Sequence, residues 1–290
     1  MSAIIIDGNL VAAEILEKTK TKTARLKALG ITPCLAVVLV GDNAASITYV
    51  SAKKKTLEKV GMENRDFRLQ ENTSEKALLT LIDQLNSDEK VHGILVQLPL
   101  PKHIDEKKIL FAIDPKKDVD GFHPISVGNL VLCRPGFLPC TPNGILALLE
   151  SYSITTSGAH AVVVGRSNIV GKPLSILLAR WEINATVTIC HTGTHDLAHH
   201  TRQADILISA AGIPNLIKAD MVKKGAAVID VGVNRIGDAT AESGYRICGD
   251  VDFPAVEKIA GYITPVPGGV GPMTIAMLLQ NVADAAERVA

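Results

Sequence analysis

Tyr49 and Lys53 are the first residues of the sequence whose types and spacing suit catalysis. They lie four apart in SITYVSAKKKTLEKVG (residues 46–61), which we predict to be a helix, so both side chains project from one face. Lys54 and Lys55 point roughly 100° and 200° away from Lys53. An aromatic ring beside an amine suits a flat heterocyclic substrate with a proton to be moved. A basic helix face in contact with water is the alternative.

Gln97 and the acidic pair Asp118 and Asp120 could add polar groups to such a site. Gln97 is the single polar residue inside the apolar strand predicted over GILVQLPLP (93–101). A buried amide must be hydrogen-bonded, so Gln97 either holds a loop or faces a ligand at the carboxyl end of the strand. The two acids alternate before Gly121 and could bind a metal, cap a turn or accept from the N–H groups of a ring. The metal is disfavoured because no third ligand has suitable spacing.

A phosphate site is predicted at AVVVGRSNIVGKP (161–173). The apolar run Ala161–Val164 leads into Gly165, a polar turn that begins with Arg166 and Ser167, and then a helical run. This order points the backbone N–H groups of the turn and the helix dipole at an anion. The spacing G-x-S-x-x-x-G departs from G-x-G-x-x-G, so an ordinary strand-to-helix turn is the alternative.

Strands and helices alternate after this turn. Short apolar runs recur as ATVTIC (185–190), DILISAAG (205–212), AAVIDVG (226–232) and YITPVPG (262–268). The segments between them are long enough for crossover helices, which predicts βαβ units and a parallel sheet covered on both faces. A dinucleotide-binding domain follows from this pattern. Its last run opens the loop PVPGGVGPMT (265–274), where a ligand can approach the bare backbone closely.

The first half of the chain is a second α/β unit by the same reasoning. Its predicted elements are a helix over 7–30, a strand over 35–41, the helix over 46–61, a strand over 67–69, a helix over 76–86, the strand over 93–101 and a helix over 106–113. Residues 114–144 are predicted to join the domains, and a helix follows to Tyr152. We expect the C-terminal helix over 271–289 to pack on the first domain. The predicted domains are therefore residues 1–140 plus 271–290, and residues 141–270.

The composition of the 290 residues excludes several classes of protein. The 30 basic residues balance the 30 acidic ones, so no strong field favours nucleic acid or an anionic membrane. The five cysteines contain no C-x-x-C pair, which argues against structural zinc or a disulfide scaffold and for reduced thiols. No run approaches the ~20 apolar residues that span a bilayer, and the N-terminus lacks the basic region of a signal peptide. We expect a soluble, cytoplasmic protein.

The segment HTGTHDLAHH (191–200) carries His195 and His199 at the spacing of a helical metal pair. No Glu follows His195 as it does in H-E-x-x-H, and the segment belongs to a crossover helix of the nucleotide domain. We therefore expect an exposed helix face here and no metal.

Several strings in the sequence, taken in order and spacing, resemble the bifunctional methylenetetrahydrofolate dehydrogenase/methenyltetrahydrofolate cyclohydrolase family. They are SITYVSAKKK, GILVQLPLP, KDVDGFHP, PCTPNG, VVVGRSNIVGKP, IDVG and TPVPGGVGPMT. The resemblance runs from about residue 7 to the C-terminus. It implies an α/β fold of two α/β domains with a folate cleft between them, the second a Rossmann-like doubly wound parallel sheet. It also implies a homodimer formed through the nucleotide domains.

The resemblance assigns residues to a folate site. They are Tyr49, Lys53, Gln97, Asp120, Pro267, Gly268 and Gly269. Tyr49 matches the aromatic residue that stacks on the pterin, and Lys53 matches the catalytic lysine. Gln97 matches a glutamine that hydrogen-bonds near that lysine. Asp120 matches the acid that accepts from the amino group and ring N–H of the pterin, and the Pro267–Pro272 loop lies against folate.

The cofactor that the resemblance implies is NADP. Gly165, Arg166 and Ser167 match the family's phosphate turn. Thr192 falls, after a small insertion, near a hydroxyl position used for the 2′-phosphate, and Val233 sits where a branched aliphatic residue contacts the cofactor. Independently, NAD enzymes of this fold usually place an acid about twenty residues past the first glycine to bind the ribose hydroxyls. The second predicted strand here ends in I-C-H-T with no acid, which favours NADP.

The expected reactions are oxidation of 5,10-methylenetetrahydrofolate to the methenyl form and hydrolysis of that form to 10-formyltetrahydrofolate. The reacting carbon lies between two nitrogens whose lone pairs stabilise the cation left when hydride departs, so hydride transfer needs positioning more than a base. Hydrolysis needs proton transfers, and a lysine whose pKa is lowered by burial and by the charge of the substrate could carry them out. We therefore expect Lys53→Met to abolish hydrolysis and to spare more of the hydride step.

Three alternatives stay open at this stage. They are a monofunctional folate dehydrogenase, another two-domain NAD(P)-dependent dehydrogenase acting on amino or hydroxy acids, and a non-catalytic folate- or nucleotide-binding protein. The second would lack the helix with Tyr49 and Lys53 and the strand with Gln97. Intact Lys53, Gln97 and Asp120 argue against the third.

Overall fold

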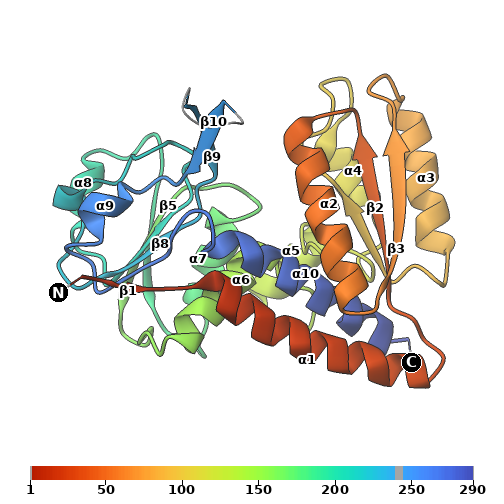
Figure 1. Cartoon of the computed structure of the whole chain (residues 1–290), viewed down its shortest axis with the longest axis horizontal. Coiled ribbons are helices and arrows are strands. Elements are labelled where there is room, and N and C mark those ends of the chain that lie inside the picture. Colours follow the sequence, from red (N-terminus) through yellow and green to blue (C-terminus); the bar gives the residue numbers. More distant parts are fainter. Residues whose placement is uncertain (1, 239–243, 290) are drawn as a thin grey trace. The chain divides into compact units, whose positions relative to one another are not determined.

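The computed structural model describes residues 2–238 and 244–289, apart from the side chains of residues 44, 45, 48 and 49. The chain forms two compact units (Figure 1). Unit 1 comprises Met1–Ala12 and Thr141–Thr274, and unit 2 comprises Ala13–Cys140 and Ile275–Ala290. Both units contain a parallel sheet and helices, as the α/β prediction requires.

The boundary near the N-terminus differs from the predicted division, which assigned residues 1–140 to one domain. The structure places the first twelve residues in unit 1. The reason is strand β1 (Ile4–Ile5), which pairs in parallel with β11 (Tyr262–Ile263) at one edge of the unit 1 sheet. A strand of two residues leaves no periodicity in the sequence, so this pairing could not be predicted.

Unit 2 is built on a three-stranded parallel sheet in the order β3-β2-β4. The strands are β2 (Cys34–Val40), β3 (Glu63–Leu69) and β4 (Gly93–Val96). All residues of the central strand β2 are buried, which accounts for its unbroken apolar run. Helices α2 (Ala44–Lys59) and α3 (Glu75–Ser87) lie on opposite sides of this sheet (Figure 1).

Four further helices contribute to unit 2. They are α1 (Gly8–Ala28), α4 (Glu106–Ala112), α5 (Pro124–Val131) and α10 (Val270–Glu287), of which α1 and α10 begin in unit 1. The C-terminal part of α10 is tied to α1, since the Nζ atom of Lys22 lies 2.6 Å from a carboxylate oxygen of Asp284 and 2.5 Å from one of Glu287. The predicted helices over 46–61, 76–86 and 106–113 are confirmed to within a few residues.

Three predicted segments of unit 2 differ from the structure. The strand predicted over 67–69 begins earlier and extends over Glu63–Leu69. The strand predicted over 93–101 ends at Val96, because the prolines that follow cannot donate to a ladder. The predicted junction over 114–144 contains α5, whose first residue is Pro124. The Nδ1 atom of His123 accepts from the backbone N–H of Ile125 at 3.1 Å and caps this helix. A histidine cap is uncommon, which hid the helix in a segment rich in glycine and proline.

Unit 1 contains a six-stranded parallel sheet in the order β1-β11-β8-β7-β5-β6. Its remaining strands are β5 (His160–Val164), β6 (Thr186–Cys190), β7 (Ile206–Ser209) and β8 (Ala227–Asp230). The chain passes from β5 to β6 on one side and returns to β7 on the other, so the strand order reverses at β5. The predicted Rossmann-like doubly wound sheet is thus confirmed, and its switch point lies at the carboxyl end of β5.

The other elements of unit 1 are short. They are α6 (Cys140–Ser151), α7 (Gly171–Leu178), α8 (Leu197–Thr201), a 3₁₀ turn over Ala219–Met221, α9 (Phe253–Val256) and an antiparallel pair formed by β9 (Asn234–Gly237) and β10 (Tyr245–Cys248). The antiparallel pair was not predicted. No helix in the described ranges has the length and apolar content that crossing a lipid bilayer requires.

Candidate active site

Lys53 is a buried lysine that α2 presents to the carboxyl end of β4. The residue is 7% exposed, and its Nζ atom donates to the Oε1 atom of Gln97 at 3.1 Å. The amide of Gln97 is held in this orientation because its Nε2 atom donates to the carbonyl oxygen of Leu98 at 2.8 Å. The sequence left two roles open for Gln97, holding a loop or facing a ligand. Its bond to Leu98 fits the first, and its bond to Lys53 places it next to the buried amine.

Asp120 adds a carboxylate beside this amine. Burial lowers the pKa of Lys53, and the charge of Asp120 opposes that shift. Burial likewise raises the pKa of Asp120, and the charge of Lys53 opposes it. Both shifts favour the uncharged forms, because buried Lys53 and half-buried Asp120 lack part of the hydration that stabilises ions in water. The amine can therefore be neutral and accept a proton under conditions where an exposed lysine could not.

Asp118 has a different role from Asp120, although both belong to the same short motif. Its carboxylate accepts from the Oγ of Ser126 at 2.6 Å, the backbone N–H of His123 at 2.8 Å and that of Phe122 at 3.2 Å. Burial raises its pKa to about 6 in spite of these three bonds. Asp118 thus caps the turn that follows Asp120, which is one of the three roles left open by the sequence.

Cys140 and Asn281 complete this region, and neither was predicted. The Sγ of Cys140 donates to the carbonyl oxygen of Val119 at 3.4 Å, and its thiol interacts with Asp120. Burial raises the pKa of this thiol. The Nδ2 atom of Asn281 donates to the carbonyl oxygens of Val119 at 2.8 Å and Leu138 at 3.1 Å, so α10 fixes the segment that carries Asp120. The string PCTPNG marked Cys140 only as part of a motif, and Asn281 gave no signal.

The lysines next to Lys53 lie outside the site. The side chain of Lys54 is 51% exposed and its Nζ atom lies 3.6 Å from Asp66, while Lys55 is exposed. Tyr49 belongs to α2, but its side chain lies outside the described part of the structure. Its predicted stacking on a ring therefore stays a prediction.

The predicted phosphate turn lies at the switch point of the unit 1 sheet. Gly165 has a φ of +134°, and a Cβ atom there would lie 2.3 Å from the carbonyl oxygen of Ala210. A Cβ atom at Gly171 would lie 2.2 Å from the carbonyl oxygen of Gly165. Only glycine fits either position, so the turn offers the bare backbone that the pyrophosphate of a dinucleotide needs. The residues present thus fit a bound NADP.

Ser167 and Arg166 occupy the same turn, and both are exposed. The Oγ of Ser167 accepts from the backbone N–H groups of Val170 at 3.1 Å and Gly171 at 3.3 Å, and so ties the turn to the start of α7. The guanidinium of Arg166 is available to a charged ligand group.

Thr192 and Val233 lie at the same edge of the sheet as the phosphate turn. Thr192 follows β6 and Val233 follows β8, and the carboxyl ends of parallel strands share one edge. Both residues are exposed. The register pairs Val164 with Cys190, so the segments that begin at Gly165 and His191 leave the sheet side by side.

The predicted substrate loop Pro267-Gly268-Gly269 follows β11. Gly268 has a φ of +104°, and its carbonyl oxygen accepts from the backbone N–H of Gly8 at 2.9 Å. A Cβ atom at Gly269 would lie 2.5 Å from the carbonyl oxygen of Pro265. The glycines therefore let this loop fold tightly on itself, with Pro267 exposed at its tip.

The histidine segment carries no metal arrangement. His195 precedes α8 rather than lying within it, and both His195 and His199 are exposed. In the part of the chain that the structure describes, no group of three or more metal-ligating side chains comes together.

Comparisons with known proteins match both halves of the chain. Residues 6–120 match the catalytic domain of tetrahydrofolate dehydrogenase/cyclohydrolase, and residues 139–290 match its NAD(P)-binding domain. The bifunctional protein FolD of Syntrophus aciditrophicus is 57% identical, over 99% of this chain and 98% of the relative.

Two solved structures share the whole fold. The bifunctional enzyme FolD from Campylobacter jejuni, a methylenetetrahydrofolate dehydrogenase/cyclohydrolase, is 52% identical with a TM-score of 0.95 and covers 100% of both chains. The Trypanosoma brucei enzyme, solved with NADP cofactor and inhibitor, is 40% identical with a TM-score of 0.95, over 100% of this chain and 99% of its own. On these matches, the chain belongs to the tetrahydrofolate dehydrogenase/cyclohydrolase family.

Proposed function

We propose that Lys53, Gln97 and Asp120 carry out the hydrolytic step of this enzyme and that the loops at the carboxyl edge of the unit 1 sheet hold its cofactor. Family membership makes the chain a bifunctional methylenetetrahydrofolate dehydrogenase and methenyltetrahydrofolate cyclohydrolase of one-carbon metabolism that uses NADP. The observation that carries the assignment of residues is the buried amine of Lys53, bonded to Gln97 and beside Asp120.

Oxidation of the methylene group requires the chain to orient its substrate. The carbon lies between two nitrogens that stabilise the developing cation, so no side chain has to remove a proton in this step. NADP⁺, when bound, accepts the hydride. Asp120 would orient the pterin by accepting from its amino group and ring N–H, and Tyr49 would stack on the pterin. The Pro267-Gly268-Gly269 loop is proposed as a folate-binding segment.

Hydrolysis of the methenyl cation requires proton transfer. Water adds to the methenyl carbon and loses one proton, which gives a neutral carbinolamine. The hydroxyl of this adduct then loses its proton as the carbonyl forms, one carbon–nitrogen bond breaks, and the ring nitrogen that leaves takes up a proton. The neutral amine of Lys53 would accept the proton of the attacking water and return one to the leaving nitrogen. Gln97 would hold the amine in place through the 3.1 Å bond between Nζ and Oε1. The sum of these steps releases one proton as the formyl product forms.

NADP would be distinguished from NAD by its 2′-phosphate. Arg166 and Thr192 are exposed on adjacent segments after β5 and β6, where a guanidinium and a hydroxyl could bind that phosphate. Cys190, His191 and Thr192 follow one another at the end of β6, and no carboxylate is among them to bind ribose hydroxyls. Val233 would contact the cofactor from the segment after β8.

The direct test is to incubate the enzyme with 5,10-methylenetetrahydrofolate and either NADP⁺ or NAD⁺ and to follow reduced cofactor and 10-formyltetrahydrofolate together. Both products should appear, with NADP⁺ clearly preferred. Reduced cofactor with no enzymatic formyl product would indicate the monofunctional alternative. A preference for NAD⁺ would contradict the roles of Arg166 and Thr192.

A homodimer formed through unit 1 is also proposed. Strand β6 is an edge strand of the six-stranded sheet, and Ile189 on it is 41% exposed. Trp181, shortly before this strand, is 87% exposed, and large exposed apolar groups next to an open edge favour pairing with a second copy.

Trp181→Lys should weaken this dimer by about tenfold or more, since it places a charge in the proposed contact. Sedimentation equilibrium measures the change. The matched control is Leu29→Lys in unit 2, which is 66% exposed and should leave the dimer intact. A monomeric parent protein, or equal weakening by both variants, would contradict the proposed interface.

The proposed location is the cytoplasm. All five cysteines are free thiols, and Cys34, Cys140 and Cys190 are buried, as expected where disulfides do not form.

A further inference from the structure

Two carboxylates that the proposed reactions do not use are buried at the carboxyl edge of the unit 1 sheet. Asp230 ends β8 and is 3% exposed, and Asp250 is completely buried. Within the described ranges neither has an ion-pair partner, so their charges are compensated by hydrogen bonds alone. Buried carboxylates arranged in this way are costly, and they persist where they fix backbone that nothing else would fix.

Asp250 gathers donors from two separate loops. Its Oδ2 atom accepts from the backbone N–H of Ala211 at 2.7 Å, that of Gly212 at 3.0 Å and the Oγ of Ser209 at 3.3 Å. Its Oδ1 atom accepts from the Nδ2 of Asn234 at 2.9 Å. One side chain thus holds the loop after β7 and the segment after β8 together.

The loop after β7 supports the phosphate turn. Strands β7 and β5 are neighbours at the switch point, and the carbonyl oxygen of Ala210 lies 2.3 Å from where a Cβ atom of Gly165 would be. Ala210 therefore contacts the glycine turn directly, and it immediately precedes the two residues whose N–H groups Asp250 accepts. The segment after β8 carries Val233, next to the Asn234 that Asp250 holds.

Asp230 in turn fixes the backbone of Asp250. Its Oδ1 atom accepts from the backbone N–H groups of Asp250 and Gly232, each at 2.9 Å, and its Oδ2 atom accepts from that of Val251 at 2.9 Å. A Cβ atom at Gly249 would lie 1.8 Å from Oδ2 of Asp230. The two carboxylates and the bare glycine backbone beside them therefore form one arrangement.

From this arrangement we infer that Asp250 is a positioning residue of the dinucleotide site. It acts on NADP binding and hydride transfer through the loop 209–212 and the segment 233–234, and it has no part in hydrolysis of the methenyl substrate. The inference rests on the proposed function, because it assumes that NADP binds at the turn of Gly165.

The test is Asp250→Asn, assayed for each activity separately. An amide has one acceptor oxygen and brings two N–H donors, so it cannot serve both the N–H groups of 211–212 and the amide of Asn234. An N–H group of the new amide then faces another N–H donor, either of residues 211–212 or of Asn234, and the loop 209–212 should shift. We expect KM for NADP⁺ to rise about tenfold or more, whereas hydrolysis of methenyltetrahydrofolate without NADP should stay within about twofold of the parent.

A second substitution makes the readout specific. In the double variant Asp250→Asn/Asn234→Asp the two side chains exchange roles, because the new amide donates to a carboxylate at 234 and its oxygen accepts from Ala211. KM for NADP⁺ should return to within about threefold of the parent. If Asp250→Asn does not fold, Asn234→Ala provides the milder loss, with KM for NADP⁺ raised by about threefold.

The matched control is Asp205→Asn at the opposite, amino-terminal edge of the same sheet. Asp205 also accepts from a backbone N–H, that of His160 at 2.9 Å, and its change should leave both activities as they are. Equal loss of both activities in Asp250→Asn, or an unchanged KM for NADP⁺, would overturn the inference. A parent enzyme without NADP-dependent oxidation would instead overturn the proposed function.

Discussion

Burial separates Lys53 from the other lysines of its helix. Lys53 is buried, whereas the side chain of its sequence neighbour Lys54 is 51% exposed. Burial lowers the pKa of Lys53, while the charge of Asp120 acts to raise it. The acidic side chain thus sets how far the pH must rise before the amine becomes neutral.

Asp120→Asn should therefore move the acid limb of hydrolysis to lower pH. Neutral Lys53 is the active form, so kcat/KM rises with pH until the amine has lost its proton. Removal of the Asp120 charge lowers the pKa of Lys53 further, because Asp120 is the larger of the two charges, with Cys140, that oppose the effect of burial. The pH profile of methenyltetrahydrofolate hydrolysis, corrected for the uncatalysed rate, measures the limb. The control is Asp66→Asn, which removes a carboxylate next to exposed Lys54. A shift of the acid limb of the pH profile to higher pH in Asp120→Asn would contradict the account.

Several residues of the candidate site could be predicted from the sequence, but the residues that hold them in place could not. Lys53 and Gln97 stood out because a polar group in an apolar strand and an amine on the face of an aromatic residue are visible in the sequence. The role of Asp118 as a turn cap stayed open among three choices, since only its distances to Ser126 and the backbone decide it. Asp250 gave no signal, because its partners come from segments distant in sequence.

Individual elements hold these residues through caps and buried bonds. The turn that begins at Asp118 leads into α5, and the carboxylate of Asp118 fixes both the turn and Ser126 of the helix. Since Asp120 lies within this turn, the stability of the turn and the geometry of the site depend on the same carboxylate.

Ser126→Ala should lower the free energy of unfolding by about 1–3 kcal/mol near neutral pH, because it removes a bond to a buried carboxylate. Burial already raises the pKa of Asp118 to about 6, and loss of the Ser126 bond raises it further. The protonated carboxyl of Asp118 contributes to the free energy of unfolding at low pH, and this contribution is lost as the pH rises through about 6. The deficit of the variant should therefore shrink on acidification.

Urea unfolding followed by circular dichroism at several pH values measures this deficit. Ser87→Ala removes an exposed bond to the carbonyl oxygen of Asp83 and should change stability by no more than about 0.5 kcal/mol. A deficit in Ser126→Ala that is independent of pH would show that Asp118 is not the group involved.

Elements with an apolar run or helical periodicity were predictable, and elements without either were not. The helices α1, α2 and α3 and the strands β2 and β5 follow from apolar runs and helical periodicity. Strand β1 exists only because β11 pairs with it. Helix α5 escaped prediction because His123 serves as its cap in place of the usual Ser, Thr, Asp or Asn.

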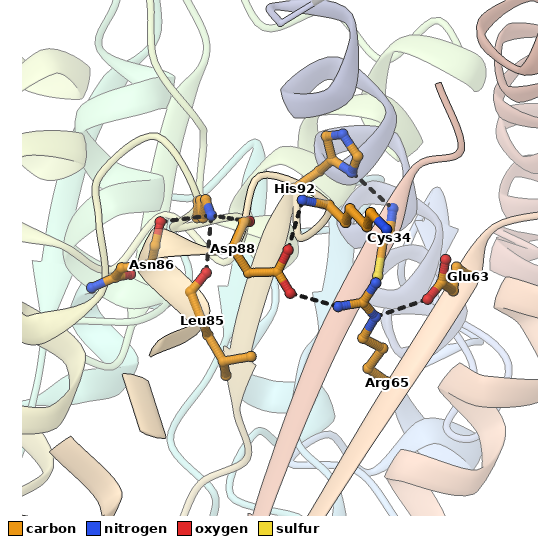
Figure 2. Close-up of polar contacts among 9 residues, drawn as sticks. Cys34, Glu63, Arg65, Leu85, Asn86, Asp88 and His92 are labelled. Carbon is orange, nitrogen blue, oxygen red and sulfur yellow. Dashed lines mark hydrogen bonds and ion pairs between the residues drawn. The ribbon is translucent and has the colours of Figure 1, made fainter. Parts of the chain in front are cut away.

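At the scale of the whole molecule, unit 2 depends on a polar network at the amino-terminal edge of its sheet (Figure 2). The Nδ1 atom of His92 accepts from the backbone N–H of Cys34 at 3.2 Å, which requires a neutral ring at that nitrogen. The guanidinium of Arg65 bridges Glu63 and Asp88, at 2.8 and 2.7 Å. The network joins the starts of neighbouring strands to the end of α3.

Acid should destabilise unit 2 through His92. Burial and then the charge of Lys117 lower the pKa of His92 in the folded chain. The unfolded chain therefore binds a proton first, and stability is lost as the pH falls through about 6.5 toward the lowered folded value. His92→Asn keeps an acceptor but cannot take up the proton, so its unfolding free energy should vary less between about pH 7 and pH 5.

The control for this prediction is His195→Asn, whose side chain is exposed in unit 1. Its pH dependence of unfolding should match the parent. A parent and a His92→Asn variant with the same slope would show that His92 contributes nothing to the acid sensitivity.

The central claim is that one buried amine carries out hydrolysis and is not needed for hydride transfer. The measurement is the pair of initial rates, reduced NADP from methylenetetrahydrofolate and loss of methenyltetrahydrofolate, for Lys53→Met beside the matched variant Lys54→Met. Hydrolysis in Lys53→Met should fall by about a hundredfold or more, with a smaller loss of oxidation, and Lys54→Met should keep both rates. Equal loss of both rates in Lys53→Met with substrate binding intact, or hydrolysis that persists, would contradict the claim.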